Sequence, residues 1–275
     1  MSLIRRNPDL AAAALLALVT ACFSEVSLSS LRESINFPLL ALLFSLMTIV
    51  AALRRAGFFS GLFCHLFQRP MNSRRMGQVF LFLSFFTSMV FTNDVSLIIF
   101  VPLAISLFKE AHALRLVIPV LTWMTIAANL GSMLTPIGNP QNLFIYAHYH
   151  LPLAEFLSIT APITALTHIP GLQEKPAALL AGHEFWISLL LSQVVSNVPA
   201  TVMLSPYTEN YTALLLGVNI GGLGTLIASM ASLISFKAYL SMRFHFARAY
   251  FLVFTGANLG FLAVLIGAYL VLWGD

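Results

Sequence analysis

Charged side chains are scarce in this sequence. Only 9% of its 275 residues are Asp, Glu, Lys or Arg, whereas 59% are apolar and the mean hydropathy is +0.90. Water-soluble domains carry about 25% charged residues, so the composition excludes an ordinary soluble fold and a disordered chain. The formal net charge of +4 comes from short basic clusters between apolar runs. This pattern is typical of a polytopic membrane protein and not of a nucleic-acid groove.

Cysteines and catalytic motifs are also lacking. The two cysteines, Cys22 and Cys64, have the spacing of neither a disulfide framework nor a metal or redox motif. The sequence contains no nucleotide-binding loop, nucleophile elbow or metalloprotease motif. It therefore predicts no enzyme activity, no cofactor and no metal centre, and neither cysteine is assigned a role.

The N-terminal segment has two interpretations. Arg5 and Arg6 precede the apolar run Leu10–Thr20, as in a signal peptide. Asp9 interrupts the basic region, however, and the composition already places the rest of the chain in a membrane. We therefore expect an uncleaved first helix over Leu10–Val26, with cleavage as the alternative.

The first 75 residues are expected to form scaffold helices. A membrane-spanning helix needs about 20 apolar residues, and Phe37–Leu53 is a second candidate after the first helix. Arginines flank Gly57–Phe67 on both sides, so this shorter piece is predicted to lie on the cytoplasmic surface. The domain 1–75 thus combines scaffold helices and an interfacial helix.

The run Met76–Phe108 predicts a re-entrant hairpin. One helix of about 33 residues would measure roughly 50 Å, too long for a hydrocarbon core of ~30 Å. A polar break, Thr92-Asn93-Asp94, lies near its middle, and basic residues flank both ends. The hairpin is therefore expected to enter and leave on the cytoplasmic side. Leu116–Ala147 then crosses outward through an interruption rich in Gly and Pro, which completes a first repeat core over residues 76–147.

The second half of the chain follows the same plan. Residues 148–182 hold one basic residue and are expected to form an outer linker. The run His183–Pro206, broken at Ser196-Asn197, and the run Tyr211–Ser235, interrupted by glycines, predict a second hairpin and broken helix over residues 183–240. Residues 241–275 hold a final transmembrane helix, Ala249–Trp273.

Basic residues fix the predicted orientation. The topology places twelve Lys and Arg inside and two outside, as the positive-inside rule requires. It puts the N-terminus in the cytoplasm and the C-terminus outside, in a multi-pass protein of the inner or plasma membrane.

The two cores share a sequence motif. Asn129–Gly138 aligns with Asn219–Ala228, and four positions are identical. Each copy follows a hairpin broken at Thr-Asn or Ser-Asn, and the two hairpins are expected to enter from opposite sides. Two such copies in opposite orientation indicate the inverted repeat of a secondary transporter. The predicted fold is an all-α polytopic membrane protein built from this repeat.

A substrate site is expected between the repeats. Free N–H groups begin each half-helix and suit anions, whereas free carbonyls end the preceding one and suit cations. Neutral side chains add donors and acceptors there, or alternatively they only satisfy the broken backbone. The residues predicted on this ground are Thr92, Asn93, Asn129, Thr135, Ser196, Asn197, Asn219, Thr225 and Ser229.

Asp94 is the only acid inside a membrane segment away from its ends. An intramembrane carboxylate is costly and by default functional. No Lys or Arg lies near either hairpin tip in the sequence, so Asp94 is expected to be protonated, to bind a cation or to face water. This favours coupling to H⁺ or Na⁺, with a sodium site predicted at Asn93, Asp94 and Asn129. The alternative is that Asp94 caps the second arm of the hairpin.

Three stretches, Phe91–Val95, Leu134–Asn142 and Ser192–Pro199, resemble the ion transporter superfamily. This group includes the arsenite permeases, the NhaD-type sodium/proton antiporters and the divalent anion/sodium symporters. The sequence is most similar to anion permeases with a citrate-transporter-like domain. The resemblance implies an elevator mechanism, in which hairpins and broken helices carry substrate past a static scaffold that often dimerises. On that pattern the loops 131–139 and 221–229 complete the site, adding Gly131, Gly138, Asn139 and Gly221.

The resemblance also implies a shortened middle. Family members have several helices between the first broken helix and the second hairpin, where this chain has only residues 143–182, so a reduced scaffold is expected. The expected function is secondary active transport of a small inorganic or organic anion, or an oxyacid, coupled to H⁺ or Na⁺. The alternatives are a Na⁺/H⁺ antiporter and a non-transporting relative that acts as a partner subunit. Expected partners are the lipid bilayer and a second copy in a homodimer, with no nucleic acid.

Overall fold

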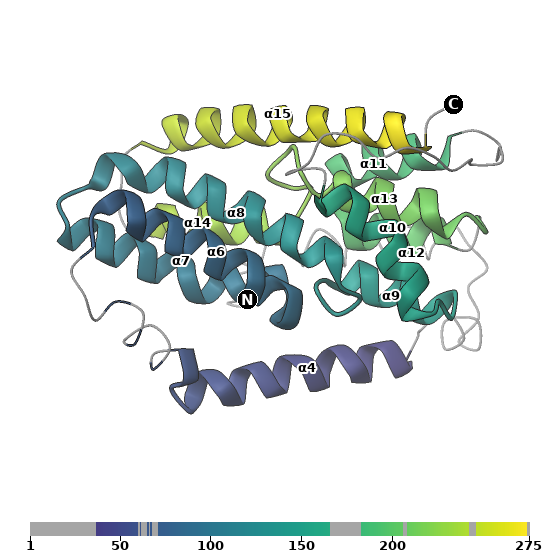
Figure 1. Ribbon diagram of the computed structural model, residues 1–275, viewed down its shortest axis with the longest axis horizontal. Helices are drawn as coiled ribbons and strands as arrows, with labels where there is room; N and C mark the ends of the chain where they lie inside the picture. Colours follow the sequence, from purple (N-terminus) through teal and green to yellow (C-terminus); the bar gives the residue numbers. More distant parts are fainter. Residues whose placement is uncertain are drawn as a thin grey trace, which may run out of the picture. The chain divides into compact units, whose positions relative to one another are not determined.

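The computed structural model describes residues 37–59, 61, 65, 67, 71–165, 183–205, 208–241 and 246–273. Over these ranges the chain is entirely helical, with eleven α-helices, one short 3₁₀ helix and no strand (Figure 1). The predicted first helix Leu10–Val26, both cysteines and five of the eleven residues of Gly57–Phe67 lie outside the described residues. Packing divides the chain into residues 1–44 and 45–275, and the helices from α6 onward all belong to the second unit.

The helices follow the predicted order. In the first half they are α4 (Phe37–Arg55), α6 (Ser73–Phe91), α7 (Asn93–Glu110), the 3₁₀ helix η1 (Leu114–Leu116), α8 (Val117–Leu134) and α9 (Pro140–His148). In the second half they are α10 (Leu153–Ala165), α11 (Glu184–Val195), α12 (Asn197–Leu204), α13 (Tyr211–Ile220), α14 (Met230–Ser241) and α15 (Ala247–Trp273).

Helix starts are set by asparagine side chains. Asn72 accepts a hydrogen bond from the Arg75 backbone at the start of α6, and Asn210 accepts one from the Ala213 backbone at the start of α13. Asn139 does the same for the Asn142 backbone, and Pro140 follows it at the first position of α9. These are preferred N-cap and N1 residues, so the chain can restart a helix immediately after each break.

One helix was not foreseen. α10 lies within the predicted outer linker, and it packs against α8, α13 and α15. Phe156 is fully buried, and the Thr160 hydroxyl donates to the Leu134 carbonyl at the end of α8. Part of the linker therefore packs on the last turn of α8, next to the first break.

The helices of the two halves interlock. α6 and α7 pack on each other and on α8, and α11 and α12 pack on each other and on α13. The helix that follows each break crosses to the other half: α9 packs against α12 and α13, and α14 packs against α7 and α8. Figure 1 accordingly shows α6, α7 and α14 together on its left side, and α11, α12 and α13 on its right.

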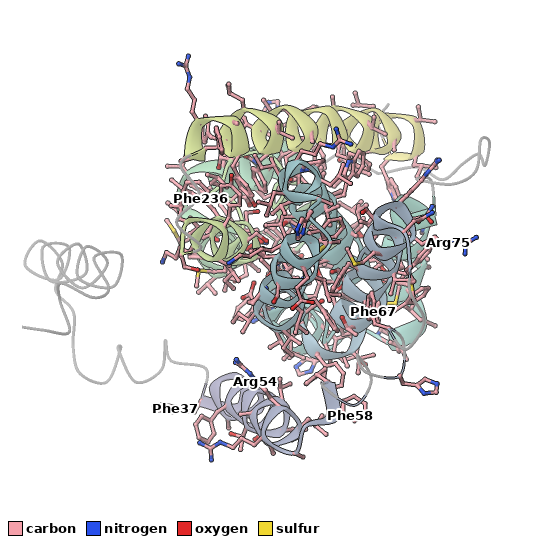
Figure 2. All side chains as sticks on the ribbon, turned by 90° about the vertical axis from the view of Figure 1, so that its left-hand side faces the viewer. Phe37, Arg54, Phe58, Phe67, Arg75 and Phe236 are labelled. Atoms are coloured by element: carbon pink, nitrogen blue, oxygen red, sulfur yellow. The ribbon has the colours of Figure 1, made fainter. Side chains whose placement is uncertain are left out.

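An apolar core fills the first half. It is built from fully buried side chains of α6, α7 and α8, such as Phe80, Phe100 and Leu121, and α14 and α15 add Tyr239, Tyr250 and Phe254. Figure 2 shows Phe236 on α14 among the packed side chains and Arg75 at the outer edge. Many large apolar residues are exposed instead, among them Phe82, Val194 and Val271, as expected where the outer surface faces lipid.

Two described helices are long and apolar enough to cross a membrane, the segment Leu114–Leu134 and Ala247–Trp273. The first is mostly buried in the protein and the second mostly exposed. α11 and α13 are apolar but shorter. Short apolar helices that end at breaks are the parts from which discontinuous membrane helices are built.

Candidate functional site

The two hairpin breaks have the same backbone conformation. Thr92, between α6 and α7, has φ 81° and ψ 151°, and Ser196, between α11 and α12, has φ 77° and ψ 153°. A positive φ is unusual for residues other than glycine and costs of order 1–3 kcal/mol. Both breaks therefore hold a strained residue at the positions that the sequence predicted.

The same backbone contact then holds each break to a loop. The Asn93 N–H donates to the Gly138 carbonyl at 3.1 Å, and the Asn197 N–H donates to the Ala228 carbonyl at 3.0 Å. Gly138 and Ala228 occupy the same position of the sequence motif. The first free N–H group of each second hairpin arm is thus satisfied by the loop of its own half.

Threonine hydroxyls repeat this correspondence. Thr135 donates to the Met89 carbonyl at 2.5 Å, and Thr225 donates to the Gln193 carbonyl at 2.9 Å. Each acceptor lies three residues before its break, and Thr135 and Thr225 occupy the same position of the motif, one of its four identical positions. The hydroxyls of Thr135 and Thr225 therefore hold the end of the first hairpin arm to the loop.

Asparagine side chains join the two halves by reciprocal pairs. Asn129 Oδ1 accepts from Asn93 Nδ2 at 2.9 Å and from the Ser229 hydroxyl at 3.3 Å. Asn219 Oδ1 accepts from Asn139 Nδ2 at 3.1 Å. Positions 129 and 219 correspond in the motif, and 139 and 229 follow it in the same register. In each half, the asparagine that begins the motif, Asn129 or Asn219, thus bonds the residue that follows the motif in the other half, Ser229 or Asn139.

Glycines allow the loops to approach the hairpins. A methyl group at Gly131 would overlap the Phe85 carbonyl oxygen, and one at Gly221 would lie 2.9 Å from the Leu189 carbonyl oxygen. A methyl group at Gly138 would overlap the backbone of Ser132. The predicted glycines therefore serve close backbone packing.

Asp94 lies in the first turn of α7, half-buried, beside these groups. Thr92 is the N-cap, and its hydroxyl accepts from the Val95 N–H at 3.4 Å. The Asp94 backbone N–H donates to Asn93 Oδ1 at 2.9 Å. Among the described residues, the Asp94 carboxylate has no hydrogen-bond or ion-pair partner. Thr92 is the N-cap, and Asp94 lies in the first turn, where a carboxylate interacts favourably with the helix dipole.

A second polar group at this place also lacks a partner. Asn129 is 4% exposed, and its Nδ2 makes no hydrogen bond with any described residue. A buried amide donor without a partner costs about 1–3 kcal/mol. Asn93 bonds both Asn129 Oδ1 and the Asp94 backbone N–H, so Asn129 Nδ2 and the Asp94 carboxylate are the groups here that lack a partner among the described residues.

Two residues of the site were missed by the sequence analysis. Gln193 Nε2 donates to the Gly221 and Leu223 carbonyls, and its Oε1 accepts from the Thr225 N–H. Asn142 Nδ2 donates to the corresponding loop of the first half, at the Ser132, Met133 and Thr135 carbonyls. Different amides on different helices thus hold the two loops. Both residues lie in the stretches that carry the family resemblance, Leu134–Asn142 and Ser192–Pro199, but neither was singled out there.

Hydrogen bonds connect several of the predicted residues. Asn93 and Ser229 bond to Asn129, and Asn139 bonds to Asn219, with Asn142 added because it accepts from Asn219 Nδ2 at 2.5 Å. Ser132 joins these two groups, since it donates to the Asn129 carbonyl and accepts from Asn139 Nδ2. Asn197 lies beside Gly222 instead of bonding to Asn219. No described group of three or more His, Cys, Asp or Glu side chains could hold a metal ion. The sodium site at Asn93, Asp94 and Asn129 stays a prediction.

Helical breaks, buried amides and an unpaired carboxylate within an apolar protein define a membrane transport protein. The sequence profile described as "Citrate transporter" matches residues 1–171, and the chain belongs to the citrate transporter family. It is thus a multi-pass membrane protein of an anion-transporting family, and the relatives found are named as transporters or membrane proteins and not as enzymes.

Three relatives show the extent of the similarity. An uncharacterized transporter of Methanocaldococcus jannaschii is 27% identical, over 71% of this chain and 79% of its own length. The inner membrane protein YbiR of Escherichia coli is 24% identical, over 74% of this chain and 80% of its own length. The silicon efflux transporter LSI3 of Oryza sativa is 32% identical over 54% of this chain and 30% of its own length. No solved structure matches.

The alignments show that this chain is shorter inside the matched region. The M. jannaschii alignment has 286 positions, but 71% of the 275 residues is about 195, so roughly 90 positions face gaps in this chain. The YbiR alignment has 302 positions against about 204 residues, which leaves roughly 100. Two relatives thus carry a similar amount of chain that is absent here.

Proposed function

We propose that this protein is a secondary active transporter that moves an anion or oxyacid in exchange for, or together with, H⁺ or Na⁺. The observation that carries the proposal is the buried Asn129 Nδ2, which has no partner among the described residues, in a helix break whose next turn carries the Asp94 carboxylate. A carboxylate in a membrane segment marks an ion or proton site by default. Asp94 is the proposed coupling residue, and the Asn129 amide is the proposed cargo donor.

The paired contacts support an inverted repeat. A two-fold relation requires that if residue i of one half meets residue j of the other, then j of the first meets i of the second. The contacts Asn129–Ser229 and Asn219–Asn139 have this form. We propose that the two hairpins are re-entrant and enter from opposite faces, with the N-terminus in the cytoplasm and the C-terminus outside. A two-fold axis in the membrane plane suits alternating access, here as an elevator.

The polarity of the site limits the cargo. The donors around Asn129 are neutral amides and hydroxyls, and Lys109, at the far end of α7, is roughly 22 Å from Asp94 along the helix. An ionised, unpaired Asp94 would repel a multiply charged anion. These features favour a neutral oxyacid or a monoanion moved with a proton. The partial similarity to a protein named as a silicon efflux transporter supports an oxyacid.

The shortened chain supports a second candidate. Roughly 90 to 100 positions of two relatives have no counterpart here, and the resemblance assigns the missing part to the scaffold. A transport core without its full scaffold would work as a partner subunit, or as a homodimer in which a second copy supplies the missing surface. This candidate predicts a stable protein that moves no cargo when it is purified alone.

Electrical recording on a solid-supported membrane tests the proposal. Purified protein in liposomes is given jumps of Na⁺, pH and a panel of oxyanions, beside the Asp94→Asn variant. Glu110→Gln is the matched control, because Glu110 is an exposed acid at the end of the same helix. The proposal predicts an anion-dependent current that changes with pH in the wild-type protein and in Glu110→Gln, and that loses its pH or Na⁺ dependence in Asp94→Asn.

Other outcomes separate the alternatives. Proton movement driven by Na⁺ with no anion present would identify a Na⁺/H⁺ antiporter. If folded protein gives no current under any of the Na⁺, pH and oxyanion jumps, the result would favour the partner subunit. An unchanged pH and Na⁺ dependence in Asp94→Asn would remove Asp94 from the coupling step.

A further inference from the structure

Several buried polar atoms have no hydrogen-bond partner in the described part of the chain. Besides Asn129 Nδ2, they are the hydroxyls of Ser84, Ser232, Tyr250 and Thr255 and the Oδ1 of Asn258. Buried polar atoms in native proteins are almost always bonded to protein or to ordered water. Three of these atoms, from Asn129, Ser232 and Tyr250, lie on helices that pack together.

These three belong to one line of polar side chains, which we call the polar row. On α8 it contains Asn129 and Thr125, which are four residues apart and share a helix face. Ser229, Ser232 and Ser235, three residues apart, form the facing side on α14 and the residue before it. Tyr250, on α15, completes the row.

Two bonds across the row place its ends. Ser229 donates to Asn129 Oδ1 at 3.3 Å, and the Thr125 and Ser235 hydroxyls are 2.7 Å apart. Thr125 also donates to the Leu121 carbonyl, so Ser235 is the donor to Thr125 and keeps its lone pairs open. The Tyr250 hydroxyl lies near Ser235 and Thr125, but it makes no hydrogen bond of acceptable geometry.

Ser232 lies between the two bonded positions. It is 1% exposed, and its hydroxyl lacks even a bond to the preceding helical turn. The buried serines Ser188 and Ser192 on α11 do make that bond. Ser232 is therefore a hydroxyl held for a partner other than the polypeptide.

Apolar side chains enclose the row. Met124, Ala128, Ala231 and Phe254 are buried members of the surrounding core, and Tyr250 is fully buried. The described titratable and charged groups on the elements around the row are Asp94, Lys109 and Glu110 on α7, Arg115 on η1, Lys237 and Tyr239 on α14, and Arg248, Tyr250 and Tyr269 on α15. Because apolar side chains surround them, the polar atoms of the row can form hydrogen bonds only with one another or with water that lies along the row.

We propose that the polar row holds ordered water and conducts protons between Asp94 and the end of the bundle at which α14 ends and α15 begins. Each internal water needs two to four polar partners, and Asn129, Ser232 and Tyr250 supply open ones. Serine, threonine and tyrosine hydroxyls both donate and accept, so a proton can enter at one side and leave at the other. Asn93 accepts from the Asp94 backbone N–H and donates to Asn129 Oδ1, which places the first turn of α7 at the inner end of the row. The amides themselves carry no proton, so the last step to the Asp94 carboxylate would run through water.

The length of the row fits this role. Ser229, in the candidate site, and Ser235, which lies near the Tyr250 hydroxyl, are six residues apart. Six helical residues span about 9 Å, roughly a third of a hydrocarbon core of ~30 Å. The row would therefore carry a proton over this short distance between Tyr250 and the candidate site. The relay role rests on the proposed function, because it matters to transport only if cargo movement is coupled to protons.

Two transport modes test the relay. Tyr250→Phe and Ser235→Ala remove hydroxyls with little change of volume, and Thr122→Val is the matched control, since Thr122 is buried on α8 but bonds only its own helix at the Ile118 carbonyl. We expect proton-driven uptake to fall about tenfold in both test variants, a barrier increase of ~1.4 kcal/mol. Exchange of labelled cargo at equal pH should stay within about twofold of the wild type, and the control should keep both modes.

Either of two transport results would overturn the relay. One is proton-driven uptake that is unchanged in both test variants. The other is an equal loss in both modes, since that pattern indicates damage to the fold or the cargo site. A wild-type protein with no transport at all would refute the proposed function instead. The presence of water in the polar row would then be tested by radical labelling alone.

Radical labelling tests the water independently of transport. X-ray radiolysis of the folded protein in detergent turns bound water into hydroxyl radicals, which oxidise the side chains next to it. We expect Tyr250 to be oxidised although it is fully buried, and Phe108, equally buried in the apolar core, to be spared. The oxidation of Tyr250 should fall in Ser235→Ala. A Tyr250 as unreactive as Phe108 would contradict the presence of water.

Discussion

Replacing Gly131 by alanine tests the close packing of loop and hairpin. The added methyl group would overlap the Phe85 carbonyl oxygen and the Ser88 hydroxyl. A backbone carbonyl cannot rotate away, so α8 and α6 must separate, and overpacking of this kind typically costs about 1–3 kcal/mol. The corresponding Gly221→Ala should behave in the same way, because its methyl group would lie 2.9 Å from the Leu189 carbonyl oxygen on α11.

Gly260→Ala is the matched control. Gly260 lies within α15, and a methyl group there meets nothing within 4 Å. Alanine gains about 1 kcal/mol of helix propensity over glycine in a helix interior, and this gain applies to Gly131 as well. The clash should therefore separate Gly131→Ala from the control by about 1–3 kcal/mol in unfolding free energy.

Thermal unfolding in detergent, followed by the fluorescence of a thiol- or tryptophan-based probe, measures the difference. We expect a lower midpoint for Gly131→Ala and Gly221→Ala, and an unchanged or higher midpoint for Gly260→Ala. Equal midpoints for all three variants would show that the loops do not approach the hairpins as described.

Two further predictions concern side chains outside the proposed cargo residues. Replacing Gln193 by leucine strands the carbonyls of Gly221 and Leu223, which should cost about 1–3 kcal/mol for each buried group; a thermal midpoint equal to the wild type would contradict this. Burial, with a smaller contribution from Glu209, raises the pKa of Tyr149 above its ordinary value of 10.0. A raised pKa means that the folded state favours the neutral phenol, so its stabilisation is complete below pH 10 and is lost as the pH rises through the raised value. Tyr149→Phe should flatten the fall of stability above pH 10, and an identical fall in both proteins would argue against this contribution.

The breaks could be predicted from the sequence because a membrane makes polar residues conspicuous. Thr92 and Ser196 stand in runs of apolar residues, and a polar group at membrane depth is tolerated only where protein or water satisfies the backbone. The motif that begins at Asn129 and Asn219 was visible for the same reason. Its reciprocal contacts with Ser229 and Asn139 were not, since pairing across two halves depends on tertiary packing.

Other features gave weak or misleading signals. α10 was taken as part of a linker because prolines flank and interrupt it, but its buried Phe156 packs on neighbouring helices. Gln193 was overlooked because one amide in an apolar run has no defined partner until the loop at Gly221 is placed beside it. The sequence could not predict that Ser232 and Tyr250 belong together. Each is an ordinary residue in a helix and becomes unusual only because its hydroxyl is buried without a partner among the described residues.

Sidedness of labelling tests the inverted repeat most directly. In a background with Cys22 and Cys64 replaced by serine, single cysteines are placed at Asn72, before α6, and at His183, before α11. A membrane-impermeant maleimide is then added to right-side-out and inside-out vesicles. Opposite insertion of the hairpins predicts that position 72 is labelled only from the cytoplasmic face and position 183 only from the outer face. Labelling of both positions from the same face would contradict the inverted repeat and the shared site built on it.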